Sequence, residues 1–315
     1  MALGEFDLIA RWFARAPRRG DVRLGVGDDA ALLDVPAGRT LVAATDTLVE
    51  GRHFLPGAPA RSVGHQSLAV NLSDLAAMGA EPAWALLSLS LPDVDEAWLD
   101  GFASGFHALA EAHRVDLVGG DTVRGPRVVT VQLLGFVDGS CALRRAGARP
   151  GDRVYVSGTP GEAAAGLDAL RGGAAFDSAD RRVRRCLYAE PRVALGQALV
   201  GRATAAMDVS DGLLGDLAKL CLASGVGARI DLDALPVSPA LATVHDRERC
   251  ERYVLEGGDD YELLFTLPPG ADAGALAGAG VAVTCIGRIE GTAGVHCVRG
   301  GRDVPYAARG YDHFG

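Results

Sequence analysis

The stretch MDVSDGLLGDLAKL, residues 207–220, joins an apolar run to an amphipathic pattern through a short acidic turn. The apolar residues before Asp208 predict a β-strand over 204–207, and the spacing of Leu213, Leu214 and Leu217 predicts a helix over 212–223. Ser210 stands where an N-cap residue would stand, and a helix N-terminus offers backbone N–H groups to phosphate. Asp211, at the same turn, is a candidate metal ligand.

The same alternation of strands and helices extends through the rest of the chain. In the first half we expect strands at 41–45, 84–91, 115–118 and 128–137, with helices at 62–78 and 95–113. In the second half we expect further strands at 153–157, 228–232, 261–267, 281–286 and 295–298, and helices at 161–171, 192–200 and 273–279. This order lacks strict βαβ repetition, so it predicts a mixed α/β (α+β) fold.

The length of 315 residues favours two domains, because single cores usually stop growing near that size. The turn ARPGD at 148–152 is the strongest break between elements. We therefore expect one domain over 1–147 and a second over 148–315.

Composition excludes several functional classes. The formal net charge of −9 argues against nucleic-acid binding, and no apolar run is long enough to cross a membrane, so a soluble cytoplasmic protein is expected. The six cysteines have no CxxC spacing and predict free thiols. Lys219 is the only lysine, and without a GxxxxGK[ST] loop neither a P-loop kinase nor a protein kinase fits.

Aspartates recur in five short blocks, GVGDDAAL, AATDT, NLSDLAAMG, VGGDT and MDVSDG, which contain Asp28, Asp29, Asp46, Asp74, Asp121, Asp208 and Asp211. Each block appears where an apolar run breaks into a turn or a helix start. Asp at such positions is often only a turn or cap residue, and this reading stands as the alternative for each block. If the blocks converge, carboxylates about 4 Å apart repel by roughly 4 kcal/mol and need cations. Oxygen ligands of this kind suit Mg²⁺, which usually arrives with phosphate.

Two blocks have further features. In VGGDT, Gly119 and Gly120 precede Asp121, which lets the backbone approach a bulky anion closely. In NLSDLAAMG, Asp74 lies late in a predicted helix, where an acid facing solvent and an acid facing a cleft are comparable expectations.

These blocks, in this order, resemble the thiamine-monophosphate kinase family of the aminoimidazole-ribonucleotide-synthetase-like superfamily. The resemblance covers essentially the whole chain and includes GEFDLIARWF, TDTLVEGRHF, NLSDLAAMGAEP, GGDDYELLF and the closing GYDHF. It implies an enzyme that transfers the ATP γ-phosphoryl group directly to thiamine monophosphate, making thiamine diphosphate, with several Mg²⁺ ions. It also implies a homodimer formed through an N-terminal domain that binds ATP and metal, and a C-terminal domain that completes the active-site cleft.

Carried over by position, the resemblance assigns roles to individual residues. The implied metal ligands are Asp29, Thr45 (through its hydroxyl or carbonyl), Asp46, Asp74, Asp121, Asp208 and Asp211, with Asp28 the less certain member of its pair. The implied catalytic acids are Asp121, Asp208 and Asp211; the implied ATP contacts are Gly120, Asp121, Arg145 and Ser210; the implied contacts to the thiamine substrate are His53, Asp259 and Tyr311.

Each assignment has a structural alternative: a loop histidine for His53, a surface charge for Arg145 and a packing aromatic for Tyr311. The chain also departs from the family pattern, with Ala44 where a serine is frequent and Asp259 where a glutamate is frequent.

Two other functions fit the acid blocks. One is another superfamily member, such as an amidine-forming synthetase or a selenophosphate synthetase. The latter expects a reactive N-terminal cysteine, and no cysteine precedes Cys141. The other is a non-catalytic nucleotide-dependent regulator, which would bind nucleotide without turnover.

Overall fold

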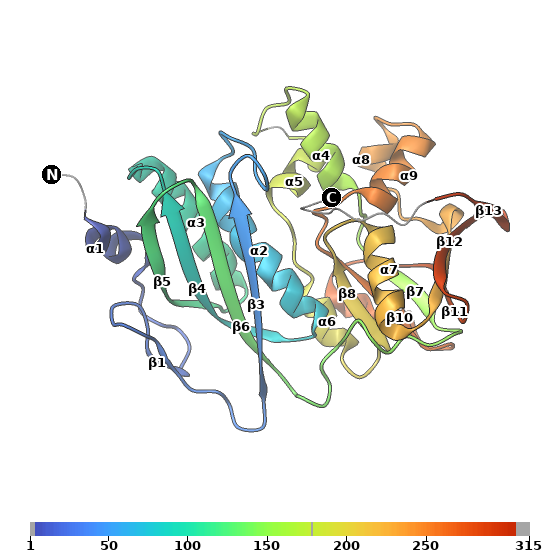
Figure 1. Ribbon diagram of the computed structural model, residues 1–315, viewed down its shortest axis with the longest axis horizontal. Helices are drawn as coiled ribbons and strands as arrows, with labels where there is room; N and C mark the ends of the chain where they lie inside the picture. The colour runs from blue at the N-terminus through green and yellow to red at the C-terminus, as the bar shows by residue number, and fades with distance from the viewer. Residues whose placement is uncertain (1–3, 178, 307–315) are drawn as a thin grey trace. The chain divides into compact units, whose positions relative to one another are not determined.

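The computed structural model describes residues 4–177 and 179–306. Contacts between Cα atoms divide the chain into two compact units. Unit 1 comprises Met1–Leu75 and Ala80–Ser140, and unit 2 comprises Ala76–Gly79 and Cys141–Gly315. Both contain sheets and helices, so the predicted mixed α/β class is confirmed (Figure 1). No helix in the described part of the chain is both long enough and apolar enough to span a bilayer.

Unit 1 is built on a four-stranded sheet in the order β3-β6-β4-β5, in which only the β4–β5 pairing is parallel. Its elements are α1 (Glu5–Leu8), the π-helical turn η1 (Ile9–Phe13), β1 (Val22–Leu24), β2 (Leu32–Leu33), β3 (Thr40–Val49), α2 (Ala60–Ala77), β4 (Glu81–Leu91), α3 (Glu96–Ala112), β5 (Asp116–Arg124) and β6 (Val128–Val137).

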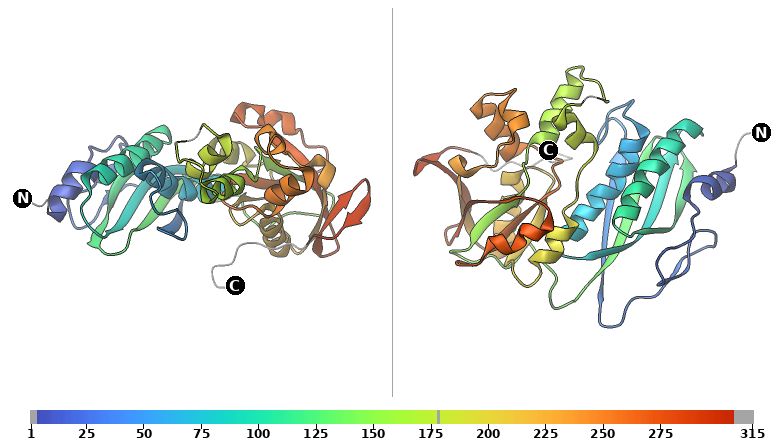
Figure 2. Two further views of the ribbon diagram at one scale, coloured as in Figure 1. Left: turned by 90° about the horizontal axis from the view of Figure 1, so that it is seen from above. Right: turned by 180° about the vertical axis from the view of Figure 1, so that it is seen from behind.

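Helices α2 and α3 cover one face of this sheet (Figures 1 and 2). They approach closely because each has a glycine at the contact. A Cβ on Gly64 would lie 2.0 Å from the Phe102 carbonyl oxygen, and one on Gly105 would lie 1.9 Å from that of Arg61. The opposite face is partly covered by β1 and β2, whose Val22 and Leu33 pack against the cluster around Trp84.

Unit 2 is built on a seven-stranded sheet in the order β13-β12-β9-β11-β7-β10-β8, in which only the β12–β9 pairing is parallel. Its elements are β7 (Arg153–Ser157), α4 (Glu162–Arg171), α5 (Arg181–Leu187), α6 (Val193–Leu199), β8 (Ala205–Val209), α7 (Leu213–Ser224), β9 (Gly227–Asp231), η2 (Leu232–Ala234), α8 (Pro239–Ala242), α9 (Arg247–Glu256), β10 (Glu262–Leu267), the 3₁₀-helix η3 (Ala273–Ala279), β11 (Val283–Glu290), β12 (Gly294–Arg299) and β13 (Arg302–Val304).

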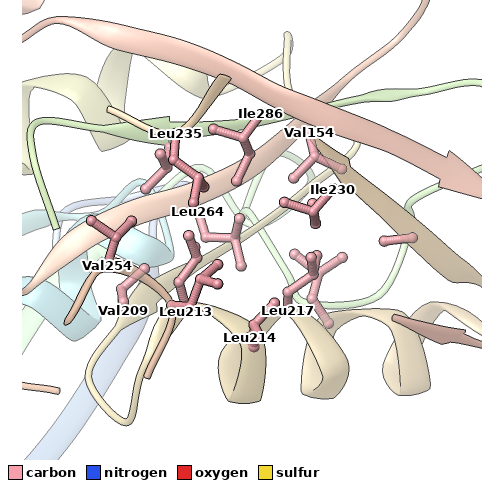
Figure 3. Packing of buried hydrophobic residues seen from close by; sticks show 14 of the residues in the cluster. Val154, Val209, Leu213, Leu214, Leu217, Ile230, Leu235, Val254, Leu264 and Ile286 are labelled. Carbon is pink, nitrogen blue, oxygen red and sulfur yellow. The ribbon is translucent and has the colours of Figure 1, made fainter. Parts of the chain in front are cut away.

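The core of unit 2 lies between α7 and the sheet. Leu213 and Leu217 of α7 are fully buried and belong to one apolar cluster with strand residues such as Val209 and Leu264, as Figure 3 shows. Spacing of the leucines by one helical turn places them on a single face, which is why the sequence pattern predicted this helix.

Three sequence expectations were wrong in local detail. Helix α7 begins at Leu213 with Gly212 as its N-cap, at φ 108°, so Ser210 is not the cap. Asp46 and Asp121 lie within β3 and β5 instead of where a strand gives way to a turn. The segment 273–279 is a 3₁₀-helix. Helix α9 was not predicted, because the many charged residues in its sequence obscure the spacing of its apolar residues.

Candidate functional site

The acidic turn after β8 is held by a buried aspartate from the following helix. Asp216 is fully buried, and its Oδ2 accepts the backbone N–H groups of both Ser210 and Asp211 at 3.0 Å. Burial raises the pKa of Asp216, while the hydrogen bond and charge of Lys219 lower it. The N–H groups of Ser210 and Asp211 are therefore occupied, and Asp216 holds the turn that carries Asp211.

Lys219 connects the two acids of this turn. Its Nζ lies 2.6 Å from Asp211 Oδ2 and 2.9 Å from Asp216 Oδ1. Burial lowers the pKa of Lys219, but its hydrogen bonds to the two carboxylates outweigh this effect and the pKa is raised. The ammonium group is therefore a charged counter-ion in direct contact with a candidate metal ligand.

The segment 259–261 is hydrogen-bonded to the same turn. The Asp259 N–H donates to the Ser210 carbonyl and the Tyr261 N–H donates to the Val209 carbonyl, both at 2.9 Å. Asp259 and Tyr261 have φ values of 62° and 52°, the left-handed region that side chains other than Gly, Asn and Asp rarely adopt. The tertiary structure thus places the candidate substrate residue Asp259 beside the candidate metal turn, with Asp208 buried at the end of β8.

Asp259 is an exposed residue, although protein atoms also lie around its carboxylate. Surrounding protein atoms raise its pKa, the Tyr261 hydroxyl that donates to Oδ1 at 3.2 Å lowers it, and the charge of Asp211 raises it. The net direction is upward, and the surrounding protein atoms are its largest cause.

A buried ionic network lies next to this segment in the chain. Glu262, 1% exposed, accepts hydrogen bonds from Arg185, Arg192 and the Ser157 hydroxyl. Asp260 accepts the Gly161 N–H at 2.7 Å, and burial holds its pKa well above the usual value.

In unit 1, two candidate metal ligands are in direct contact. The carboxyl groups of Asp46 in β3 and Asp74 in α2 are hydrogen-bonded to each other. Burial raises the pKa of Asp46, and the contacts with Asp74 and with His53 lower it by less. His53 Nδ1 accepts the Val49 N–H at 3.1 Å, which orients the ring. Asp46 and Asp74, from a strand and a helix of unit 1, are therefore neighbours, and His53 lies near Asp46.

Thr45 differs from its neighbour Asp46 in direction. Successive side chains of a strand point to opposite faces, and the exposures along β3 alternate accordingly, with Thr45 exposed and Asp46 partly buried. Because Asp46 contacts α2, the Thr45 hydroxyl points to the other face of the sheet. Of the two routes proposed for Thr45, this leaves the backbone carbonyl, which lies in the plane of the sheet.

Gly120 and Asp121 lie in β5 opposite Leu87 and Ser88 of β4. Gly120 has φ 151°, and a Cβ there would lie 1.8 Å from the Leu87 carbonyl oxygen. Glycine is therefore required at this position by the neighbouring strand, whatever its role toward a nucleotide. Asp121 is exposed.

The remaining candidates are more dispersed. Asp28 and Asp29 are exposed, with the Asp29 N–H donating to the Asp28 carboxylate at 2.8 Å. Arg145 is exposed and its carbonyl accepts the Ser224 hydroxyl at 3.0 Å. Tyr311 lies outside the described residues.

Metal ligation can be judged from the donors present. Within 4–177 and 179–306, no three His, Cys, Asp or Glu side chains are grouped closely enough to hold an ion by themselves. Mg²⁺ usually needs only one or two carboxylates together with water and substrate phosphates. The carboxyl groups of Asp46 and Asp74 are in contact, and a cation stabilises two acids placed in this way. Oxygen donors of this kind fit Mg²⁺ bound with a nucleotide.

The residues missed by sequence reasoning are Asp216, Lys219, Asp260 and Glu262. Asp216 and Lys219 are three residues apart on α7, which places them on one helix face, and this spacing was the available signal. The partners of Asp260 and Glu262 lie far away in sequence, and no local pattern indicates them.

Comparison with known proteins shows the family of the chain. The family model for the N-terminal domain of AIR synthase related proteins matches residues 27–137, and that for the C-terminal domain matches residues 149–298. The chain is 49% identical to the thiamine-monophosphate kinase of Escherichia coli K12 over 322 aligned positions, covering 100% of this chain and 99% of the relative.

Solved structures give the same result. A crystal structure of thiamine-monophosphate kinase from Stenotrophomonas maltophilia K279a has a TM-score of 0.88 and 45% identity, covering 96% of this chain and 99% of that one. AaThiL complexed with AMPPCP and TMP has a TM-score of 0.79 and 33% identity, covering 92% of each chain. With both family domains matched and full-length relatives at this identity, the chain belongs to the thiamine-monophosphate kinase family of AIR synthase related enzymes.

Proposed function

We propose that this protein phosphorylates thiamine monophosphate to thiamine diphosphate, with ATP as the donor and Mg²⁺ as the required ion. The observation that carries the proposal is the full-length similarity to AaThiL, which was solved with an ATP analogue and TMP. The local chemistry supports it, because the Asp46 and Asp74 carboxylates are in contact in unit 1 and the charge of Asp211 acts on Asp259 in unit 2, and acids placed in this way favour a cation.

Binding roles follow the chemistry of the side chains. Mg²⁺ would be held by Asp29, the Thr45 carbonyl, Asp46, Asp74, Asp121, Asp208 and Asp211. ATP would contact Gly120, Asp121, Arg145 and Ser210, and the thiamine substrate would contact His53, Asp259 and Tyr311. Bound Mg²⁺ supplies charge neutralisation for two polyanions that must approach each other.

The protein's own residues supply orientation. Asp216 holds the turn that carries Asp211, and the hydrogen bonds from Asp259 and Tyr261 join that turn to the substrate segment. The acceptor is a phosphate oxygen, already ionised near neutral pH, so no strong general base is needed. The acid blocks contain no cysteine or lysine nucleophile, and we propose a single in-line transfer without a phosphoenzyme.

The test is direct. Purified protein with ATP, Mg²⁺ and thiamine monophosphate should yield thiamine diphosphate and ADP in equal amounts, followed by ³¹P NMR against a heat-killed control. Absence of product above the control refutes the activity. Nucleotide binding without turnover would favour the regulator alternative. With an ATP analogue that carries a chiral γ-phosphorothioate group, a single in-line transfer inverts the configuration at the transferred phosphorus. Retention of that configuration would contradict the proposed mechanism.

The acid assignments are tested by Asp121→Asn and Asp211→Asn. Both should abolish turnover while the circular dichroism spectrum and melting curve remain those of a folded protein. Asp303→Asn is the matched control, because Asp303 is exposed and pairs only loosely with Arg229 at 3.5 Å. Normal turnover in either test variant would remove that acid from the metal set.

We also propose that residues 1–147 form the ATP- and metal-binding domain and make a homodimer, and that the protein acts in the cytoplasm. The edge strands of the unit 1 sheet, β3 and β5, offer unpaired backbone groups that can pair with a second copy of the chain. Sedimentation equilibrium of the purified chain tests the dimer, and a concentration-independent monomer would refute it. Cell fractionation tests the location.

A further inference from the structure

The only lysine of the chain is in an unusual position for a surface cation. Lys219 is 40% exposed at its side chain, yet its ammonium group contacts Asp211 and Asp216 at 2.6 and 2.9 Å. One of these acids is fully buried, and the other is a proposed metal ligand. The other thirty basic residues of the chain are arginines, so lysine stands here alone.

We propose that Lys219 is a positioning residue that holds Asp211 in the metal-free protein and competes with Mg²⁺ for its carboxylate. This inference rests on the proposed function, because it takes Asp211 as a metal ligand. According to this inference, Lys219 sets the concentration of divalent ion at which the protein is half-saturated.

The first support is electrostatic. Asp211 and Asp216 contribute two negative charges to one turn, and Asp259 and Asp208 lie close by in the structure. Like charges at such distances repel, so a metal-free turn needs a cation to keep its shape. Lys219 is the cation that contacts Asp211 there.

The second support is geometric. Asp216 Oδ2 already holds the N–H groups of Ser210 and Asp211, and its Oδ1 holds the lysine. The ammonium group is therefore held on one side by Asp216, which is fixed by its hydrogen bonds to the turn. On its other side the ammonium group contacts Asp211. An incoming ion must displace it from Asp211 or share the carboxylate with it.

The third support is the choice of lysine. Its ammonium sits on a flexible four-carbon stem and binds carboxylates as a point charge, whereas a guanidinium would grip them as a rigid fork. A partly exposed stem can withdraw toward solvent when an ion arrives, without loss of the anchor at Asp216.

The experiment measures Mn²⁺ binding by electron paramagnetic resonance in the presence of AMPPCP, so no turnover is required. The key variant is the double substitution Asp216→Asn with Lys219→Met. It removes one negative and one positive charge, so the net charge is unchanged, and the asparagine oxygen still accepts the two N–H groups. The ammonium 2.6 Å from Asp211 Oδ2 then no longer competes for that carboxylate, so the half-saturating Mn²⁺ concentration should fall by roughly tenfold.

Two single variants complete the set. Asp216→Asn alone leaves the lysine with Asp211 as its anionic partner, and half-saturation should rise by about threefold or more. Lys219→Arg keeps the charge and should stay within about threefold of the native protein. A purely structural role for Lys219 would lower thermal stability in the double variant without tightening Mn²⁺ binding.

Unchanged Mn²⁺ affinity in the double variant, or tighter binding in Asp216→Asn, would overturn the inference. Failure of the native protein to bind Mn²⁺ would overturn both the inference and the metal dependence of the proposed function. Mn²⁺ binding with the expected order of variants, but no thiamine diphosphate formed, would support the inference while the proposed activity falls.

Discussion

Replacing Glu262 by glutamine should destabilise unit 2 strongly. Glu262 Oε1 accepts hydrogen bonds from Arg192 at 2.5 Å and from Arg185 at 3.0 Å, and Oε2 accepts from Arg192 Nε at 2.7 Å and the Ser157 hydroxyl at 2.5 Å. Both oxygens are therefore saturated with donors. Glutamine keeps the size of the side chain but turns one acceptor into a donor that faces other donors.

The magnitude follows from burial. Side chains of Glu262, Arg185 and Arg192 are 1%, 6% and 16% exposed, so water cannot replace the lost partner. Removing one member of a buried ion pair costs about 3–5 kcal/mol, because the remaining charge is left uncompensated. For a domain of 150–250 residues this corresponds to a fall in melting temperature of roughly 6–20 °C.

Thermal unfolding followed by circular dichroism measures the effect. Glu248→Gln is the matched control, since Glu248 is 80% exposed and pairs with Arg252 at 3.3 Å on the surface of α9. Such pairs contribute about 0–1 kcal/mol, so its melting temperature should hardly change. A shift for Glu262→Gln as small as that of the control would show that the buried network does not stabilise the fold.

Two further predictions concern the backbone of β5 and the titration of a buried acid. Gly120→Ala should lower the free energy of unfolding, measured in urea, by ~1–3 kcal/mol, because its Cβ would lie 1.8 Å from the Leu87 carbonyl oxygen. Gly20→Ala is the control and should be nearly neutral, because no atom lies within 4 Å of its Cβ. Equal effects of the two substitutions would refute the contact. The raised pKa of Asp260 means that the native protein loses stability as pH rises through that pKa. Asp260→Asn, which still accepts the Gly161 N–H, should therefore gain stability relative to the native protein as the pH of urea titrations rises above about 4, the ordinary pKa of an aspartate. A pH-independent difference would contradict the assignment.

The sequence alone determined the mixed α/β class, most element positions and the family. Strand β6 matches the predicted range 128–137, and β7 matches the range 153–157. These predictions succeed because the pattern of apolar residues within a segment indicates which of them are buried. The acid blocks were visible for a similar reason. The spacing of these aspartates to nearby glycines and apolar runs can be read directly from the sequence. The resemblance to known enzymes rests on that spacing.

The tertiary structure alone decided how charged residues are paired. The contact of Asp46 with Asp74, the opposite direction of Thr45, and the capture of the 209–211 turn by Asp216 depend on how strands and helices pack. Charged residues are expected at the surface by default, so nothing local predicts that Asp216 and Glu262 are buried. The left-handed backbone at Tyr261 is likewise maintained by a hydrogen bond to a distant turn, because local preference opposes it.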